Sequence, residues 1–306
     1  MLRKTFVALT TLTALAAVAM MLSAQAPAGG GGKGGGKAPA APPAIALVKP
    51  GLYIVTGLGG NTSVRVGTDG VFVADTKNLG EDNYQQLIAL IKTVTPLPVK
   101  FAAITHVHQD HSGNGGSFIR DGAQVWAQAN LKTELVTYNP AQGKPAEPSN
   151  TYTVSQNVPL AGARIELHYY GAAHTGGDTL VYFPDLRVIH GGDVLVGAGP
   201  NCDFPNGGSA VSWIKVLDEV AKLDFDTVVP GHSAPGATTM TRAEFDAYRT
   251  KWKTFVQRAI DEVKKGTPKE GLIAAIKVDD IAPITATSYG QAGRLDPFYA
   301  ELQAAK

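Results

Sequence analysis

The sequence contains very little cysteine, because Cys202 is the only one in 306 residues. A single cysteine cannot form a disulfide within the chain, and it excludes a zinc cluster built from several thiolates. A catalytic thiol needs a neighbouring base to activate it, and the sequence leaves no histidine arrangement free for that task. We therefore expect Cys202 to be a half-buried loop residue.

An excess of charge of one sign is also missing. The sequence has 27 Lys and Arg against 26 Asp and Glu, a formal net charge of +1. No basic run that could follow a phosphate backbone occurs in the part that we expect to fold, so we expect no nucleic-acid partner. The chain also lacks a Gly-x-Ser-x-Gly segment, which excludes the strand-to-helix turn that carries many serine nucleophiles.

Long apolar runs are confined to the beginning of the chain. Residues 1–26 combine Arg3 and Lys4, an apolar stretch over residues 5–22 and small residues at the end, which is typical of a secretory signal peptide. The alternative is an uncleaved membrane anchor, since the stretch is close to the minimum of ~17 residues that spans a bilayer. We expect a periplasmic or secreted protein that meets a membrane only through an uncleaved signal segment.

The rest of the chain divides into a short linker and one large domain. Residues 27–44 are rich in glycine, alanine and proline and have almost no large apolar side chains, which predicts a flexible linker. From residue 45 to residue 306, short apolar runs alternate with turns and helix-spaced segments, which predicts a single α/β domain that ends in helices. The expected strands are residues 52–56, 62–66, 71–75, 99–105, 123–127, 164–170, 179–183, 187–190 and 226–229. The expected helices are residues 81–93, 113–120, 210–223, 242–265, 269–276 and 296–304.

Four side chains that can bind a metal lie within one short segment, at His106, His108, Asp110 and His111. Histidine and aspartate are poorly suited to burial without partners, so packing does not explain the cluster. In an extended segment alternate residues point the same way, so His106 and His108 would aim at one point and Asp110 would continue the alternation. His111 would point elsewhere. Two ligands for one metal and two for a neighbour is the natural division, and paired hydrolytic metals lie about 3.5–4 Å apart.

Further candidate ligands follow predicted strands, each beside glycines that let the backbone approach closely. They are His174 in Gly-Ala-Ala-His-Thr, Asp193 in Gly-Gly-Asp and His232 in Pro-Gly-His. Asp75 ends a predicted strand and is a candidate for orienting the ligand loop from behind. His168 is expected to pack or face solvent, and His190 has either a supporting or a core role.

These segments together resemble the metallo-β-lactamase superfamily. The motif H-x-H-x-D-H matches His106, His108, Asp110 and His111, and the later segments match at His174, Asp193 and His232. The resemblance covers residues 52–232 and implies a four-layer αβ/βα sandwich with a dinuclear zinc site at one edge. It implies one zinc on His106, His108 and His174, a second on Asp110, His111 and His232, and Asp193 as the bridge.

The resemblance also implies the chemistry, which is attack of a zinc-activated hydroxide on a carbonyl, with Asp110 orienting the nucleophile and handling its proton. The small-molecule substrate would be a β-lactam, lactone, ester or thioester. Three features point away from β-lactams: Asp193 stands where one lactamase subclass has cysteine, Val196 stands where that subclass often has lysine, and the turn at residues 57–61 is short. An iron-dependent redox enzyme and a non-catalytic metal-binding protein remain alternatives. We expect a monomer.

Two loops are left to determine specificity. Residues 130–159 are polar and contain prolines, and no order of elements is predicted for them. Residues 197–208 contain Asn201 and Asn206, either of which could contact substrate.

Overall fold

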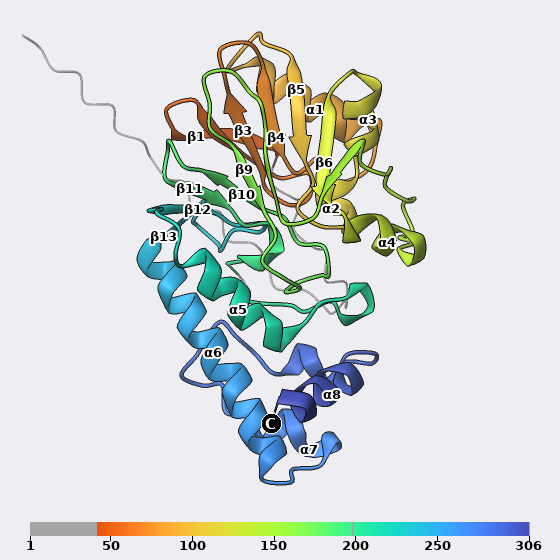
Figure 1. Cartoon of the computed structure of the whole chain (residues 1–306), viewed down its shortest axis with the longest axis vertical. Helices are drawn as coiled ribbons and strands as arrows, with labels where there is room; N and C mark the ends of the chain where they lie inside the picture. Colours follow the sequence, from red (N-terminus) through yellow and green to blue (C-terminus); the bar gives the residue numbers. More distant parts are fainter. Residues whose placement is uncertain (1–41, 198, 306) are drawn as a thin grey trace, which may run out of the picture. The chain divides into compact units, whose positions relative to one another are not determined.

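A computed structural model describes residues 42–197 and 199–305 (Figure 1). The predicted signal peptide and most of the predicted linker lie outside the described residues. Strand β1 (Ala44–Lys49) begins at the last residue of that linker, one residue earlier than the domain start that we predicted. Among the described helices, none combines the length and the apolar character that crossing a membrane requires.

The first sheet has seven strands in the order β1-β2-β3-β4-β5-β6-β7. Strands β1 to β4 form an antiparallel meander, and β4 to β7 pair in parallel. The predicted strands of this half are confirmed to within two residues, although β1 itself was not predicted as a strand. The bounds are β2 (Leu52–Thr56), β3 (Thr62–Val66), β4 (Val71–Ala74), β5 (Val99–Ala103), β6 (Gln124–Gln128) and β7 (Asn150–Tyr152).

The second sheet has six strands in the order β13-β12-β11-β10-β9-β8. Its strands are short, and only β11 and β12 pair in parallel. Four of them coincide with predicted strands, which were drawn up to four residues too long. The bounds are β8 (Ser155–Asn157), β9 (Glu166–His168), β10 (Leu180–Phe183), β11 (Val188–His190), β12 (Thr227–Val229) and β13 (Met240–Thr241).

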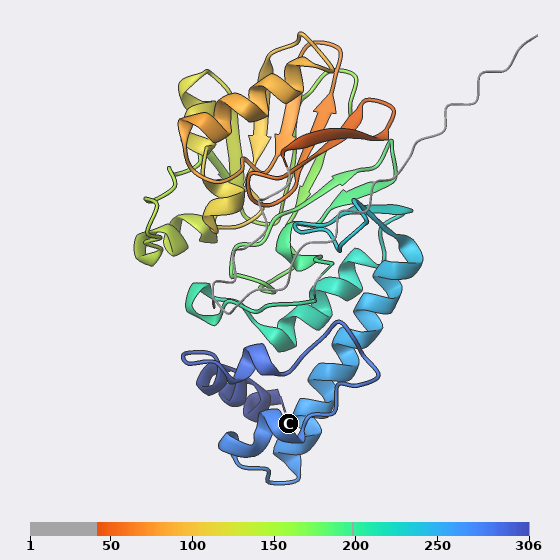
Figure 2. The ribbon, with the colours of Figure 1, turned by 180° about the vertical axis from the view of Figure 1, so that it is seen from behind.

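The helices cover the outer faces of the two sheets. Figure 2 shows α1 (Glu81–Lys92) against the first sheet, and α3 (Gly115–Arg120) lies on the same side. Helices α5 (Ala210–Val220) and α6 (Arg242–Lys264) cover the second sheet. The arrangement is the four-layer αβ/βα sandwich that we predicted.

Three separate apolar cores fill the spaces between the four layers, and strand periodicity explains them. In β4, Val71 and Val73 pack toward α1, whereas Phe72 and Ala74 face the second sheet. In β10, Leu180 packs toward α5 and α6, while Val181 faces the first sheet. Neighbouring residues of a strand point to opposite faces, so a strand that is buried on both sides reads as a continuous apolar run.

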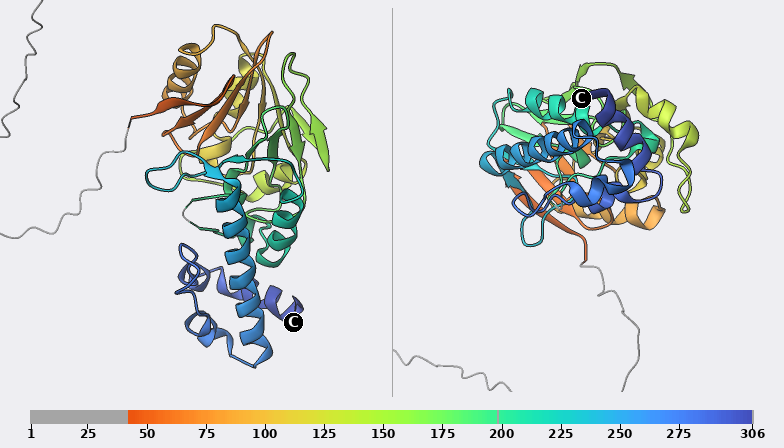
Figure 3. Two further views of the ribbon diagram at one scale, coloured as in Figure 1. Left: turned by 90° about the vertical axis from the view of Figure 1, so that its left-hand side faces the viewer. Right: turned by 90° about the horizontal axis from the view of Figure 1, so that it is seen from below.

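The chain after β13 is helical, as predicted. The Thr241 side chain accepts from the Glu244 backbone N–H and the Glu244 side chain reaches back, which is the capping box expected at the start of α6. Helices α7 (Lys269–Ala275) and α8 (Leu295–Ala305) pack at the far end of α6 (Figure 3). Their apolar residues, including Phe298 and Leu302, continue the core beneath the second sheet.

Two local predictions need correction. The loop at residues 130–159 contains helix α4 (Asn130–Thr137) and strands β7 and β8, because Leu131 and Leu135 bury one helical face that the polar composition obscured. The strand predicted to reach residue 105 ends at Ala103. The backbone then bends and enters the short helix α2 (Gln109–Ser112), which was not predicted.

Candidate metal centre

The seven predicted ligands lie at one end of the two sheets, where loops following the strands meet. They form two groups, and within each group one donor atom per residue lies within 4.8 Å of the others. The first group contains His106, His108, His174 and Asp193, and the second contains Asp110, His111 and His232. The structure therefore brings together all seven predicted ligands.

The division into two groups has a different cause from the one that we predicted. Asp110 and His111 belong to helix α2, so Asp110 does not continue the alternation of His106 and His108. The backbone turns because Ser112 donates both its N–H and its hydroxyl to the His108 carbonyl. Neighbouring helical residues are rotated by about 100°. Neighbouring residues of a strand instead point to opposite faces. The smaller rotation of the helix therefore lets the adjacent side chains of Asp110 and His111 reach the same point.

The hydrogen bonds of the first group fix which ring nitrogens face inward. His174 Nδ1 donates to the Asn201 carbonyl at 2.5 Å, and His108 Nε2 donates to Asp203 Oδ2 at 2.6 Å. Both partners are pure acceptors, so in the neutral rings the opposite nitrogens carry lone pairs. Those nitrogens, His174 Nε2 and His108 Nδ1, face each other at 3.0 Å. Two lone pairs cannot form a hydrogen bond.

His106 completes the same pattern. Thr105 Oγ1 donates to Asp75 Oδ2 at 2.9 Å and therefore accepts from His106 Nδ1, which lies 3.0 Å away. His106 Nε2 then carries a lone pair, and it is buried with no hydrogen-bond partner among the described residues. A buried polar atom without a partner is unusual in a folded protein. A cation between the three histidines would satisfy all of these nitrogens.

The electrostatics of the first group agree with neutral ligands. Burial, reinforced by the neighbouring His108, lowers the pKa of His174 to about 4. Burial also holds the pKa of His106 well below its usual value, reinforced by the surrounding histidines. Both side chains are therefore neutral at pH 7, which is the form of histidine that binds a metal.

The second group is organised around His111. Its Nδ1 donates to Asp75 Oδ2 at 2.7 Å, which leaves Nε2 as the nitrogen that faces the group. That atom lies 3.2 Å from His232 Nε2 and 3.4 Å from Asp110 Oδ2. Burial opposes a positive charge on His111, but Asp193, Asp75 and Asp110 outweigh it and raise its pKa well above the usual value. A cation that binds here therefore displaces a proton.

Asp193 lies between the two groups. Its Oδ1 is 3.3 Å from His111 Nε2, and its Oδ2 is 3.7 Å from His174 Nε2. Oδ1 is also buried without a hydrogen-bond partner in the described part of the chain. One carboxylate oxygen thus faces each group, which is the geometry of a bridging ligand.

A network behind the ligands holds His111 in place. Asp75 is fully buried and accepts from Thr105, His111 and His190. His190 also contacts Ser63 Oγ at 2.9 Å, so the network extends into the first sheet. Asp75 therefore has the orienting role predicted for it, and His190 has the supporting one of its two alternatives.

Sequence reasoning missed Asp203, although it lies in the loop that was singled out. An isolated aspartate in a polar loop carries no signal of its own. Asn206 Nδ2 donates to Asp203 at 2.6 Å, and the Asn201 carbonyl accepts from His174. Both asparagines thus support ligand histidines.

The remaining candidates lie outside the two groups. Cys202 is fully buried in the core, which differs from the half-buried position predicted, and burial raises its thiol pKa well above the usual value. It is not a nucleophile at neutral pH. His168 stacks on Tyr170 with ring centroids 5.5 Å apart and contacts Glu166 at 3.2 Å, so it packs at the surface as expected.

The most exposed side chains among the predicted ligands belong to the second group. The side chains of His232 and Asp110 are 41% and 31% exposed, whereas His111 and His174 are almost completely buried. A substrate would therefore approach over the second group. Burial of the other ligands keeps their hydrogen bonds out of competition with water.

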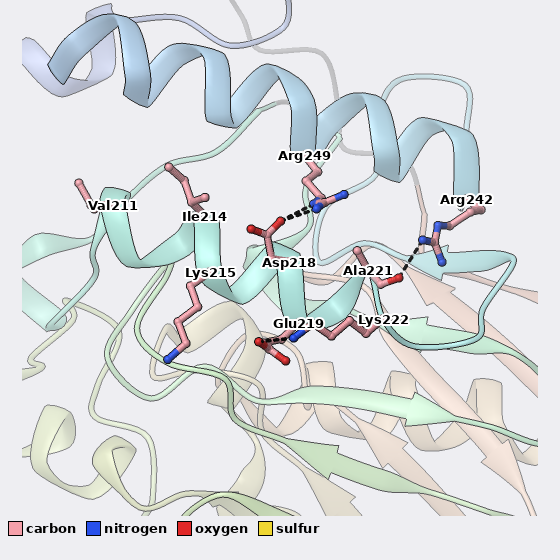
Figure 4. Close-up of a pocket in the computed structure, with 9 residues that line it drawn as sticks. All are labelled: Val211, Ile214, Lys215, Asp218, Glu219, Ala221, Lys222, Arg242 and Arg249. Carbon is pink, nitrogen blue, oxygen red and sulfur yellow. Dashed lines mark hydrogen bonds and ion pairs between the residues drawn. The ribbon is translucent and has the colours of Figure 1, made fainter. Parts of the chain in front are cut away.

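A surface hollow of about 820 Å³ lies elsewhere, between α5 and α6 (Figure 4). Most of its charged groups are already paired; for example, Arg249 contacts Asp218 at 2.5 Å and Lys222 contacts Glu219 at 2.7 Å. The nine residues that line it include no histidine or cysteine. Size alone thus does not identify the functional site here.

Comparisons with known proteins agree with the site. Residues 55–232, more than half of the chain, match the family described as the metallo-beta-lactamase superfamily. The chain is 29% identical over 225 residues to the 2,4-dinitroanisole O-demethylase subunit alpha of Nocardioides sp. (strain JS1661), covering 73% of this chain and 63% of that protein. It is 27% identical over 154 residues to the metallo-beta-lactamase IND-1 of Chryseobacterium indologenes, covering 49% and 62%. The chain thus spans less than two thirds of either relative.

The solved structures support the fold. A metallo-beta-lactamase from Pontibacter korlensis superimposes with a TM-score of 0.59 at 18% identity, covering 69% of this chain and 99% of that one. At this identity the likeness establishes the architecture alone. With the family match over residues 55–232, it confirms the resemblance seen in the sequence: the chain belongs to the metallo-beta-lactamase superfamily.

Proposed function

We propose that this chain is a dinuclear zinc hydrolase that cleaves a carbonyl compound. The observation that carries the proposal is the pair of inward-facing lone-pair nitrogens, His174 Nε2 and His108 Nδ1, 3.0 Å apart. Two nitrogens bound to one tetrahedral zinc lie about 3.3 Å apart. The donors are imidazole nitrogens and carboxylate oxygens, which suit zinc.

Zinc ions held by these residues would act as Lewis acids and bring the ionisation of water into the neutral pH range. The chain supplies the geometry. Asp193 directs one carboxylate oxygen to each group, and Asp75 and Asp203 keep the proton-bearing ring nitrogens of His111 and His108 pointing outward. These fixed groups need no reorganisation when charge develops on a substrate oxygen.

Asp110 is the residue that we assign to proton handling. Its Oδ2 lies 3.0 Å from His232 Nε2, on the open side of the site. Burial would raise the pKa of its carboxyl, but His111 and His232 outweigh that effect and hold the pKa well below the usual range. Asp110 is thus ionised at neutral pH and can accept a hydrogen bond from a water molecule that attacks the substrate.

A lactone, ester or thioester is the substrate class that we favour over a β-lactam. Val196 is buried, so the position where one lactamase subclass has a lysine presents no cation. The turn at residues 57–61 packs directly on Asp110 and His111 and leaves no long flap. A second candidate is cleavage of an electron-poor aryl methyl ether, because the relative at 29% identity is named a 2,4-dinitroanisole O-demethylase subunit.

For the location and the assembly of the protein, we keep the predictions made from the sequence. We propose a periplasmic or secreted monomer that acts on a small molecule and contacts no nucleic acid. An iron-dependent redox enzyme and a binding protein without turnover are the competing readings, because imidazole and carboxylate also suit iron.

A substrate panel on zinc-loaded protein tests the proposal. It should contain nitrocefin, a lactone, an aryl ester, a thioester and 2,4-dinitroanisole. We expect turnover of at least one carbonyl substrate, lost on chelation and restored by zinc. Turnover of the ether alone would favour the second candidate. Protein that is inert with two zinc ions bound, or that is active only with iron and a redox partner, would contradict the proposal.

A further inference from the structure

Lys77 is a buried lysine that the metal centre does not use directly. It is completely inaccessible to solvent and follows Asp75 by two residues. Its Nζ donates to the carbonyls of Val55 and Gly60, each at 2.7 Å. Burial lowers the pKa of the Lys77 ammonium to about 7, against the attraction of Asp75 and Asp110. A buried ammonium group is unfavourable unless its hydrogen bonds are satisfied, and carbonyls satisfy them here.

The carbonyls that Lys77 binds lie at the two sides of one turn. Val55 is near the end of β2, and Gly60 lies just before β3, so the ammonium group closes the base of the turn at residues 57–61. Lys77 and Asp75 both have positive φ, 69° and 68°, which a residue with a side chain adopts only when its surroundings hold it there. The lysine is thus fixed at its backbone as well as at its ammonium group.

The same turn forms one wall of the second ligand group. Gly60 N–H donates to the Asp110 carbonyl at 3.1 Å. A Cβ atom on Gly60 would lie 2.2 Å from His111 Cε1, so the backbone of the turn is pressed against the His111 ring. Asn61 Nδ2 donates to Pro230 O and Ser233 Oγ, both at 2.8 Å, and these residues flank His232. The turn therefore contacts all three parts of the group.

We propose that Lys77 is a positioning residue for the second metal: by clamping the carbonyls of Val55 and Gly60, it holds the turn against Asp110, His111 and the His232 loop. The inference rests on the proposed dinuclear function, and it assigns the lysine to one of the two metals. The histidines of the first group are held by Asp203 and Asn201, whereas Lys77 Nζ donates to the turn. We therefore expect metal binding at the first group not to depend on Lys77.

The test measures the two metal affinities separately in full-length protein, by chelator competition with zinc and by the visible spectrum of the cobalt-substituted protein. Lys77→Met removes the ammonium group and keeps an apolar stem. Lys77→Gln keeps N–H donors without the charge. Lys92→Met, on the exposed side of α1, is the matched control. In Lys77→Met we expect the second metal to bind about 10- to 100-fold more weakly, the range typical for residues that support metal ligands, and the first to be unchanged.

Lys77→Gln should lose less affinity than Lys77→Met, and it decides the question if Lys77→Met does not fold. Thermal unfolding of each metal-free variant shows whether the fold is kept. Two metals bound as in the wild type by a folded Lys77→Met would overturn the inference, and so would an equal loss at both positions. A wild-type chain that binds only one metal would instead overturn the dinuclear function, so the two failures are distinguishable.

Discussion

The nitrogens His174 Nε2 and His108 Nδ1 face each other at 3.0 Å, and each is a lone-pair acceptor. Their tautomers are determined by what lies behind them, the Asn201 carbonyl for His174 and Asp203 for His108. Between neutral rings this contact is repulsive without a cation, and a cation bound by both nitrogens would relieve the repulsion. The backbone and second-layer hydrogen bonds thus prepare the site before a metal arrives.

Asp203 is the first residue to test, because without it nothing among the described residues determines which ring nitrogen of His108 carries the proton. Asp203→Ala should weaken metal binding to the three-histidine group by about 10- to 100-fold. Asp224→Ala, a change at an aspartate whose side chain is 77% exposed, should leave the affinity unchanged. Equal metal affinities in the wild type and in Asp203→Ala, measured by chelator competition, would show that His108 needs no such partner.

Asp75 supports the other group through His111. Asp75→Asn replaces a carboxylate that accepts several hydrogen bonds by an amide. The new amide NH₂ group would then face one of the groups that donate to Asp75, so two donors would meet. We expect weaker binding of the second metal and a loss of about 1–3 kcal/mol in the free energy of unfolding. Chemical denaturation with and without zinc measures both effects. A variant as stable as the wild type would mean that the buried network is not maintained in solution.

Asp110 should be essential for turnover but not for the fold. Asp110→Asn keeps the size of the side chain and removes its charge and its ability to take a proton. We expect hydrolysis of the substrate found in the panel to fall at least about 100-fold, the usual contribution of a general base. Asp69→Asn, at an exposed ion pair with Lys100, is the control. Full activity in Asp110→Asn would refute the assignment of proton handling.

Glu134 gives a prediction for pH. It is 8% exposed, and neither carboxylate oxygen has a hydrogen-bond partner among the described residues. Burial, together with the charge of Asp178, raises its pKa from 4.5 to about 8. Between these values the folded protein retains a proton that the unfolded chain releases, so the free energy of unfolding falls as pH rises from about 4.5 to 8.

Glu134→Gln removes this dependence. Relative to that of the wild type, the free energy of unfolding of the variant should rise by on the order of 1–3 kcal/mol between pH 4.5 and pH 8. Denaturant unfolding at several pH values measures the difference, with the exposed Glu147→Gln as control. Parallel pH profiles for the wild type and Glu134→Gln would show that Glu134 finds a partner in solution.

The sequence predicted the parts of this protein that repeat a periodic pattern or a dense motif. Strands such as β2 and β3 and the capped helix α6 were predicted almost to the residue, because alternation and the Thr241–Glu244 pair are local signals. Helix α2 was missed, since a single turn leaves no periodicity. Asp203 and Lys77 were missed because their partners are distant in sequence, and only the folded chain brings them together.

Anomalous diffraction at the zinc absorption edge can show whether these residues hold two metals. Crystals of zinc-loaded protein should show two peaks about 3.5–4 Å apart. One peak should lie among His106, His108 and His174, and the other among Asp110, His111 and His232, with Asp193 between them. A single peak, or zinc bound outside these residues, would rule out a dinuclear centre at this site.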